Sequence, residues 1–86
     1  MKIHILKTAR EVFGDLITGA KKAEFRKNDR SFKVGDILYL REYVDCDDYK
    51  DYSGNELFYQ ITHIQTGFGI PEDYVMLSIE KLDKTL

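Results

Sequence analysis

The chain has 86 residues, 43% of them hydrophobic and 13% aromatic, and its formal net charge is -2 at pH 7. This size and composition suit one small folded domain over residues 1–86 and exclude a disordered chain, while the single cysteine, Cys46, excludes an internal disulfide and a multi-cysteine zinc site. Since no apolar run is long enough for a membrane span or a signal peptide, we expect a cytoplasmic protein without membrane contact.

The first predicted element is a strand at 2–7, where Ile3 and Ile5 stand two positions apart. A capping box that begins at Thr8 then predicts a helix over 8–18, in which apolar residues recur at helical spacing. The glycine that follows this segment suits the left-handed backbone of a helix end. We therefore expect one helix near the N-terminus, with one apolar face.

The hydrophobic period changes from helical to two after this helix, which predicts a second strand. Ala23 and Phe25 alternate with Lys22, Glu24 and Arg26, so we expect the first pair to be buried and the other three to share a polar face. A carboxylate held between two cations is stabilised as an anion, and it is a good acceptor for an arginine.

Three further strands are predicted at 37–43, 56–66 and 74–82, joined by loops at 44–55 and 67–73. One helix cannot cover both faces of an open five-stranded sheet. We therefore predict an α+β fold, a small, strongly curved, mixed β-barrel of about five strands with the helix at one end.

Charge is divided unevenly along the chain. Residues 1–41 hold ten Lys or Arg against five Asp or Glu, whereas residues 42–86 hold three against ten. We name residues 21–33 the basic segment, because six cations lie within it: Lys21, Lys22, Arg26, Lys27, Arg30 and Lys33. Clustered cations repel one another unless an anion lies among them, and phosphate is a frequent partner, so this segment indicates an anionic ligand.

The stretch 45–56 is acidic, and its carboxylates partly match the spacing of a calcium-binding loop. Lys50 stands where that loop needs glycine, so we expect no calcium there. His4 and His63 lie far apart, without further ligands nearby, and we expect both to be structural and the chain to hold no metal or cofactor. The acidic stretch is then a solubilising loop or a contact for a protein partner.

The basic segment and the residues after it resemble the signature of ASCH domains, in the PUA-like superfamily, and in particular a small branch of largely uncharacterised bacterial and phage proteins. The residues that carry the resemblance are Gly19-x-Lys21-x-x-Glu24-x-Arg26 and, after a polar turn, Val34-Gly35-Asp36. The resemblance extends from the first strand to residue 82. It implies a β-barrel with a cleft beside the first helix, lined by the Gly-x-Lys-x-x-Glu-x-Arg residues.

RNA binding is the function that the resemblance implies, by analogy with PUA domains, although some relatives are assigned as acetylated-cytidine amidohydrolases or as a ribonuclease. The amidohydrolase pattern uses a lysine, which Lys21 matches, and a threonine, where this chain has Glu24. Its distant glutamate has only Glu72 and Glu80 as candidates. This departure from the pattern argues against that activity.

Our leading hypothesis is a non-catalytic module that binds RNA or a modified nucleotide, as a monomer or weak homodimer. Tyr39 or a nearby tyrosine would stack on a base, since every nucleobase offers a flat face. The alternative is a small hydrolase in the same cleft, with Lys21, desolvated beside cations, as base or nucleophile and Glu24 holding the attacking water. The residues expected to contact the ligand are Lys21, Lys22, Glu24, Arg26, Lys27 and Arg30, together with Tyr39.

Overall fold

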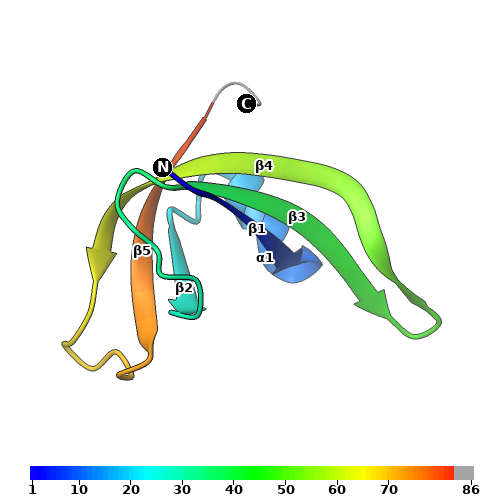
Figure 1. Cartoon of the computed structure of the whole chain (residues 1–86). Helices are drawn as coiled ribbons and strands as arrows, with labels where there is room; N and C mark the ends of the chain where they lie inside the picture. The colour runs from blue at the N-terminus through cyan, green and yellow to red at the C-terminus, as the bar shows by residue number, and fades with distance from the viewer. Residues whose placement is uncertain (83–86) are drawn as a thin grey trace.

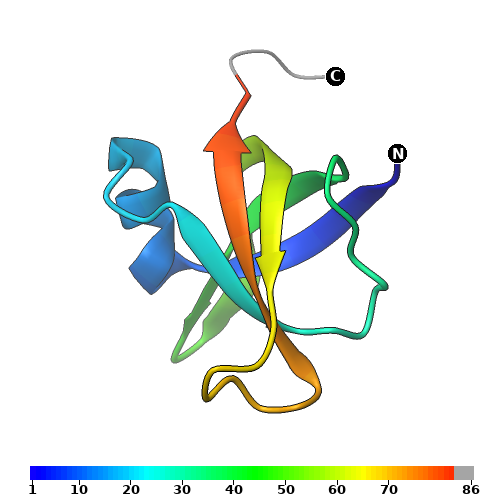
Figure 2. The same cartoon turned by 90° about the vertical axis from the view of Figure 1, so that its left-hand side faces the viewer.

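The computed structural model describes residues 1–82, so the last four residues of the predicted domain lie outside the described residues. These residues form one bent, five-stranded mixed sheet and a single helix (Figures 1 and 2). In chain order the elements are β1 (Ile3–Ala9), α1 (Arg10–Thr18), β2 (Ala23–Lys27), β3 (Ile37–Cys46), β4 (Tyr49–Gln65) and β5 (Tyr74–Lys81).

The strand order in the sheet is β1-β3-β4-β5-β2, with β1 parallel to β3 and the other neighbouring pairs antiparallel. Both edges of the sheet, β1 and β2, lack backbone pairing with each other within residues 1–82, so the sheet is open rather than the closed barrel that we predicted. Two arginine side chains, one on β2 and one in the segment that follows it, bond to β1 instead. Arg26 Nη2 donates to the Lys7 carbonyl at 3.2 Å, and Arg30 Nη1 donates to the Ile5 carbonyl at 3.1 Å.

One hydrophobic core holds the sheet and the helix together. Phe13 and Leu16 of α1 are fully buried, and the Tyr59 hydroxyl on β4 donates to the Leu16 carbonyl at 3.0 Å, which fixes the end of the helix against the sheet. The buried cluster consists of Leu6, Leu16, Phe32, Leu38, Leu40, Tyr59, Ile61, Val75, Leu77 and Ile79.

The helix is shorter than predicted. It begins at Arg10, because Thr8 belongs to β1 and its buried side chain makes no cap. The N-cap residue is Ala9, and the helix has no side-chain capping hydrogen bond at this end. The helix ends as expected at Gly19, whose φ of 83° is costly for residues with a Cβ atom. At nine residues, the only helix among residues 1–82 is far too short to traverse a bilayer.

In the edge strand β1, the inward-facing residues are His4, Leu6 and Thr8, whereas Ile3 and Ile5 are about half exposed. Directly paired residues share one face of a sheet, and His4 pairs with Leu38 of β3, which is fully buried. The register with β3 therefore decides which face of β1 points to the core.

In the other edge strand, β2, the predicted faces are reversed. Glu24 is buried at 4% exposure, whereas Phe25, expected in the core, is 44% exposed. Glu24 pairs with Leu77 of β5, and Arg26 pairs with Val75, both of which are core residues. The pairing with β5 therefore overrides the apolar alternation of this short strand and turns the acid inward.

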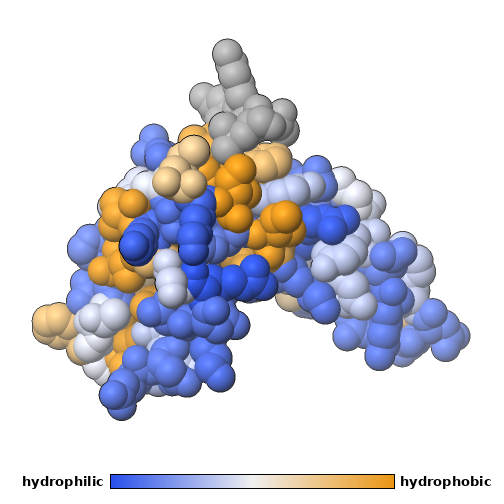
Figure 3. All heavy atoms as spheres, in the orientation of Figure 1, coloured by the Kyte–Doolittle hydropathy of each residue, from blue (hydrophilic) through white to orange (hydrophobic). Residues whose placement is uncertain are grey.

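The predicted loop at 44–55 is instead the end of a β3–β4 hairpin, because only Asp47 and Asp48 interrupt the strands. Asp47 adopts a φ of 37°, a left-handed conformation that aspartate tolerates in tight turns. The register shifts between Arg41 and Tyr43, and such a bulge bends a hairpin. Beyond it, residues 42–55, which we name the arm, project from the body with a largely hydrophilic surface (Figures 1 and 3).

Candidate functional site

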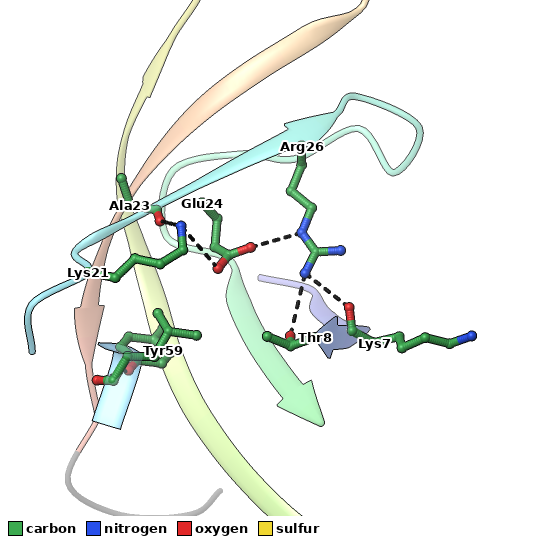
Figure 4. A network of polar contacts seen from close by, with 8 residues as sticks. Lys7, Thr8, Lys21, Ala23, Glu24, Arg26 and Tyr59 are labelled. Atoms are coloured by element: carbon green, nitrogen blue, oxygen red, sulfur yellow. Dashed lines mark hydrogen bonds and ion pairs between the residues drawn. The ribbon is translucent and has the colours of Figure 1, made fainter. Parts of the chain in front are cut away.

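Glu24 lies at the centre of the candidate site, because the register of β2 turns its side chain inward beside two cations (Figure 4). Arg26 Nε donates to Glu24 Oε2 at 3.0 Å, and Lys21 Nζ lies 3.7 Å from Glu24 Oε1. The carboxylate is nearly inaccessible to solvent, with a side-chain exposure of 6%. A buried carboxylate needs such cations, since water no longer stabilises its charge.

Arg26 has further partners on β1, which hold its guanidinium in one orientation. Its Nη2 donates to the Lys7 carbonyl and lies 3.5 Å from the Thr8 hydroxyl oxygen. The guanidinium therefore connects the buried acid to the free edge of the sheet. This use of Arg26 explains part of the positive charge in the basic segment without a ligand.

Glu24 Oε1 has no hydrogen-bond donor among the residues that the structure describes, although it is fully buried. The nearest cation, the Lys21 ammonium, is beyond hydrogen-bond distance and donates instead to the Ala23 carbonyl. Buried acceptors without donors cost free energy and are rare in folded proteins. Among residues 1–82, this oxygen is therefore the one buried side-chain atom of the lining that lacks a donor.

A cavity of about 420 Å³ opens beside this ion-pair network, between the end of β1, the start of α1, and β2. Its walls carry four cations against a single carboxylate. They also carry a stacked aromatic pair, Phe25 and Tyr74, with ring centroids 5.1 Å apart and planes inclined by 14°. The lining residues are Lys7, Thr8, Ala9, Val12, Lys21, Glu24, Phe25, Arg26, Lys27 and Tyr74, and we name this space the basic cavity.

Four of the predicted site residues come together in the basic cavity, and three do not. Lys21, Glu24, Arg26 and Lys27 line it. Lys22 instead lines a smaller, mainly apolar cavity of about 220 Å³ on the far side of Lys21, next to Tyr59. Arg30 bonds the Ile5 carbonyl, and Tyr39 stacks on Phe58 near the base of the arm at 4.5 Å.

Sequence reasoning missed several residues of the basic cavity. Lys7 and Thr8 were assigned only to a strand and to a helix cap, Phe25 to the core, and Tyr74 to the start of the last strand. They meet because β1 and β2 are the two edges of a bent sheet, and β5 pairs with β2 from Tyr74 onward. No local pattern in the sequence signals this meeting of the edges.

His4 forms a buried pair with Asp36, at 2.8 Å between His4 Nε2 and Asp36 Oδ2, and its ring packs on Phe32. The hydrogen bond from His4, with smaller contributions from the backbone N–H groups of Lys2 and Lys33, lowers the pKa of Asp36 below its usual range despite burial. This pair ties the start of β1 to the turn before β3. The expectation of a structural histidine at this position agrees with this geometry.

The arm and its base carry polar contacts of a different kind, which are open to solvent. The hydrogen bond from Tyr39 to Glu56 raises the pKa of the phenol, and Arg41 lies 3.8 Å from the same carboxylate. Glu42 accepts from Ser53 at 2.6 Å, which lowers the pKa of that carboxyl. Across residues 1–82, no three His, Cys, Asp or Glu side chains cluster closely enough to hold a metal ion.

Comparison with known proteins gives two matches. A family model described as "Domain of unknown function (DUF3850)" matches residues 3–79, a range that includes every residue of the basic cavity. A protein of Escherichia phage P2, described as an uncharacterized 12.9 kDa protein in the GpA 3' region, is 37% identical over 76 residues. That alignment covers 88% of this chain and 66% of the phage protein, so the chain spans less than two thirds of its relative.

Proposed function

We propose that this chain, which belongs to the DUF3850 family, binds a nucleotide or a short segment of RNA in the basic cavity. The observation that carries the proposal is the composition of the cavity lining, which combines four cations and a stacked aromatic pair with a single buried acid. Phosphate and a flat base are the two parts of a nucleotide that such a wall complements.

The cations of the cavity divide into two groups by their existing partners. Arg26 and Lys21 are engaged with Glu24, so one positive charge of that trio remains uncompensated. Lys7 and Lys27 add two further charges, and neither has a carboxylate within ion-pair distance among residues 1–82. The Lys7 ammonium lies 4.2 Å from the centre of the Tyr43 ring, a contact that leaves its charge uncompensated. These two lysines supply the phosphate contacts, because lysine binds phosphate as a mobile point charge.

The aromatic pair supplies the second contact, with the base. Phe25 is 44% exposed on the outer side of β2 and is already stacked with Tyr74 of β5. A base that extends this stack gains contact without a specific hydrogen bond, and the expected gain is about 1–3 kcal/mol per base. These rings take the role that the sequence suggested for Tyr39.

The bent sheet supports a relation to ASCH domains. In this proposal the bonds to β1 from Arg26 of β2 and from Arg30, which follows β2, take the place of the last backbone pairing of a barrel. RNA binding by ASCH domains is then the nearest functional analogy. A cytoplasmic site of action fits this proposal, since Cys46 is a free, exposed thiol.

A salt titration of RNA binding tests the proposal. We expect the logarithm of the affinity for a short single-stranded RNA to fall linearly with the logarithm of the salt concentration, by about 0.7 per neutralised phosphate. Two or three phosphate contacts then give a slope of about 1.4 to 2.1. An affinity that does not change with salt, or no binding at low salt, would overturn the proposal.

The Lys21–Glu24 pair also favours a second candidate, a small hydrolase that uses the same cavity. In that scheme Lys21 is base or nucleophile, and Glu24 holds the attacking water or the substrate amine. Incubation with acetylated cytidine and with short RNA separates this candidate from simple binding. Product formation that is abolished in Lys21→Ala supports the hydrolase, whereas turnover that survives this change removes these roles.

A further inference from the structure

We infer that the ligand of the basic cavity is a ribonucleotide, and that Glu24 recognises it by accepting a hydrogen bond from a sugar hydroxyl. This inference rests on the proposed nucleotide binding and adds the residue that distinguishes RNA from DNA. It starts from one oxygen atom, Glu24 Oε1, which is buried in the wall of the cavity without a donor.

The chemistry of this oxygen defines the ligand group that it accepts. An ionised carboxylate repels phosphate and offers only acceptor positions, so the group that meets it carries an O–H or N–H and no negative charge. Burial excludes bulk water as the donor. A ligand hydroxyl placed here satisfies the oxygen with a charge-assisted hydrogen bond, which is among the stronger neutral-to-charged contacts in proteins.

The arrangement of the cavity selects the sugar as the source of this donor. The aromatic pair of Phe25 and Tyr74 is partly exposed and receives the base, while Lys7 and Lys27 receive the phosphate. The sugar lies between base and phosphate in any nucleotide, and we assign it to Glu24, the deeply buried member of the lining. Carboxylates serve as acceptors for ribose hydroxyls in dinucleotide-binding proteins, so the contact is chemically ordinary.

Lys21 gives this oxygen a way to become accessible. Its side chain is 30% exposed, its ammonium lies 3.7 Å from Glu24 Oε1, and its hydrogen bond goes to the neighbouring Ala23 carbonyl. The long, flexible stem of a lysine turns toward a bound phosphate at little cost. Arg26 remains on Oε2, so the carboxylate keeps its orientation while Oε1 accepts the hydroxyl.

The test compares short oligonucleotides of one sequence that differ only at the 2′ position, which is hydroxyl, hydrogen, fluorine or methoxy. We expect the hydroxyl form to bind the wild-type protein about tenfold more tightly than the other three, since one charge-assisted hydrogen bond is lost. The fluoro form nearly keeps the size of the hydroxyl and the methoxy form is larger, and neither donates a hydrogen bond. The same four sugars are then compared in oligonucleotides of four different base compositions. This series shows whether the difference in affinity depends on the base instead of the sugar.

Glu24→Gln is the matched protein variant, with Glu56→Gln at the exposed base of the arm as control. The neutral amide accepts a weaker hydrogen bond, so we expect the preference for RNA to fall to about threefold or less in Glu24→Gln and to persist in Glu56→Gln. Circular dichroism establishes that each variant is folded. If Glu24→Gln does not fold, the 2′ series on the wild-type protein decides alone.

The outcomes separate this inference from the proposed function. Equal, salt-dependent binding of all four sugars overturns the role of Glu24 and leaves nucleotide binding in place. An affinity that depends on the base but not on the sugar also overturns the inference. So does a loss of the preference for RNA in Glu56→Gln that equals the loss in Glu24→Gln. Absence of binding by every oligonucleotide overturns both proposals together.

Discussion

The basic segment and the base of the arm each contain an arginine–glutamate pair, but in different surroundings. Arg26 and Glu24 are 3.0 Å apart, and the glutamate side chain is 6% exposed. Arg41 and Glu56 are 3.8 Å apart, with side chains 36% and 38% exposed. The first pair connects both edges of the sheet to the core, whereas the second lies on the outer surface of a hairpin.

Burial, rather than pairing, therefore decides how much a charged side chain contributes to the stability of this protein. In the arm, water stabilises each ion with or without its partner, so a pair adds little. In the basic cavity, loss of one partner leaves a charge where water cannot reach it. The same contrast explains how a chain with a net charge of -2 maintains a positive cavity, since most of its acidic groups lie elsewhere and are solvated.

The largest expected effect comes from removing the arginine of the buried pair. Arg26→Leu leaves the Glu24 carboxylate without its hydrogen-bonded cation and removes one bridge to β1. We expect the free energy of unfolding in urea to fall by about 3 kcal/mol. The matched change Arg41→Leu at the base of the arm is expected to cost less than about 1 kcal/mol. Equal losses in the two variants would contradict the comparison.

The second effect concerns Asp36, whose carboxylate accepts from His4 and from two backbone N–H groups. We expect Asp36→Asn to cost about 2 kcal/mol at pH 7, because two backbone donors and a histidine lose a charged acceptor. The exposed Asp45, paired with Lys50 at 3.8 Å, provides the control, and Asp45→Asn should leave stability nearly unchanged.

The pKa of Asp36 also predicts a pH dependence. Since that pKa is lowered in the folded state, the carboxylate adds stability above its unfolded pKa, roughly pH 4. This contribution disappears as the pH falls through the lowered value. Denaturant titrations at a series of acidic pH values should therefore show a flatter decline for Asp36→Asn than for the wild-type protein. Parallel curves would rule out this assignment.

A smaller effect concerns RNA binding by Lys27, a lysine of the basic cavity that forms no ion pair with a carboxylate among residues 1–82. Lys27→Ala removes one proposed phosphate contact from the basic cavity, and we expect the salt slope of RNA binding to fall by about 0.7. Lys50→Ala removes the same charge from the arm and should leave the slope unchanged. Fluorescence anisotropy at several salt concentrations measures both, and an identical slope for Lys27→Ala and wild type would exclude this contact.

The smallest effect is confined to one phenol near the base of the arm. Glu56→Gln removes the charged acceptor of the Tyr39 hydroxyl, so the pKa of Tyr39 should fall back toward the ordinary value of about 10. The ultraviolet absorbance of tyrosinate, titrated in variant and wild type, reports this change. We expect no measurable change in unfolding by urea at pH 7, and a clear loss of stability would show that the arm contributes to the core.

The order of strands and helix agrees with the local sequence patterns, and the spacing of Lys21, Glu24 and Arg26 predicted that these residues meet. Local pattern did not predict the faces of β1 and β2, because each is an edge strand whose orientation depends on a partner far along the chain. Local pattern also did not predict the arm. Turn-forming and charged residues such as Asp51 and Gly54 are typical of a loop, but here they belong to a long strand of the β3–β4 hairpin.

The amino-acid sequence alone predicts the five strands, the helix that ends at a glycine and the concentration of cations in the basic segment, because these features depend on neighbouring residues. The burial of Glu24, the bonds from Arg26 and Arg30 to β1, and the cavity that Lys7 and Tyr74 line together with Glu24 and Arg26 depend on the tertiary structure. The reason is the register of strand pairing, since a shift by one residue moves every side chain of a strand to the opposite face.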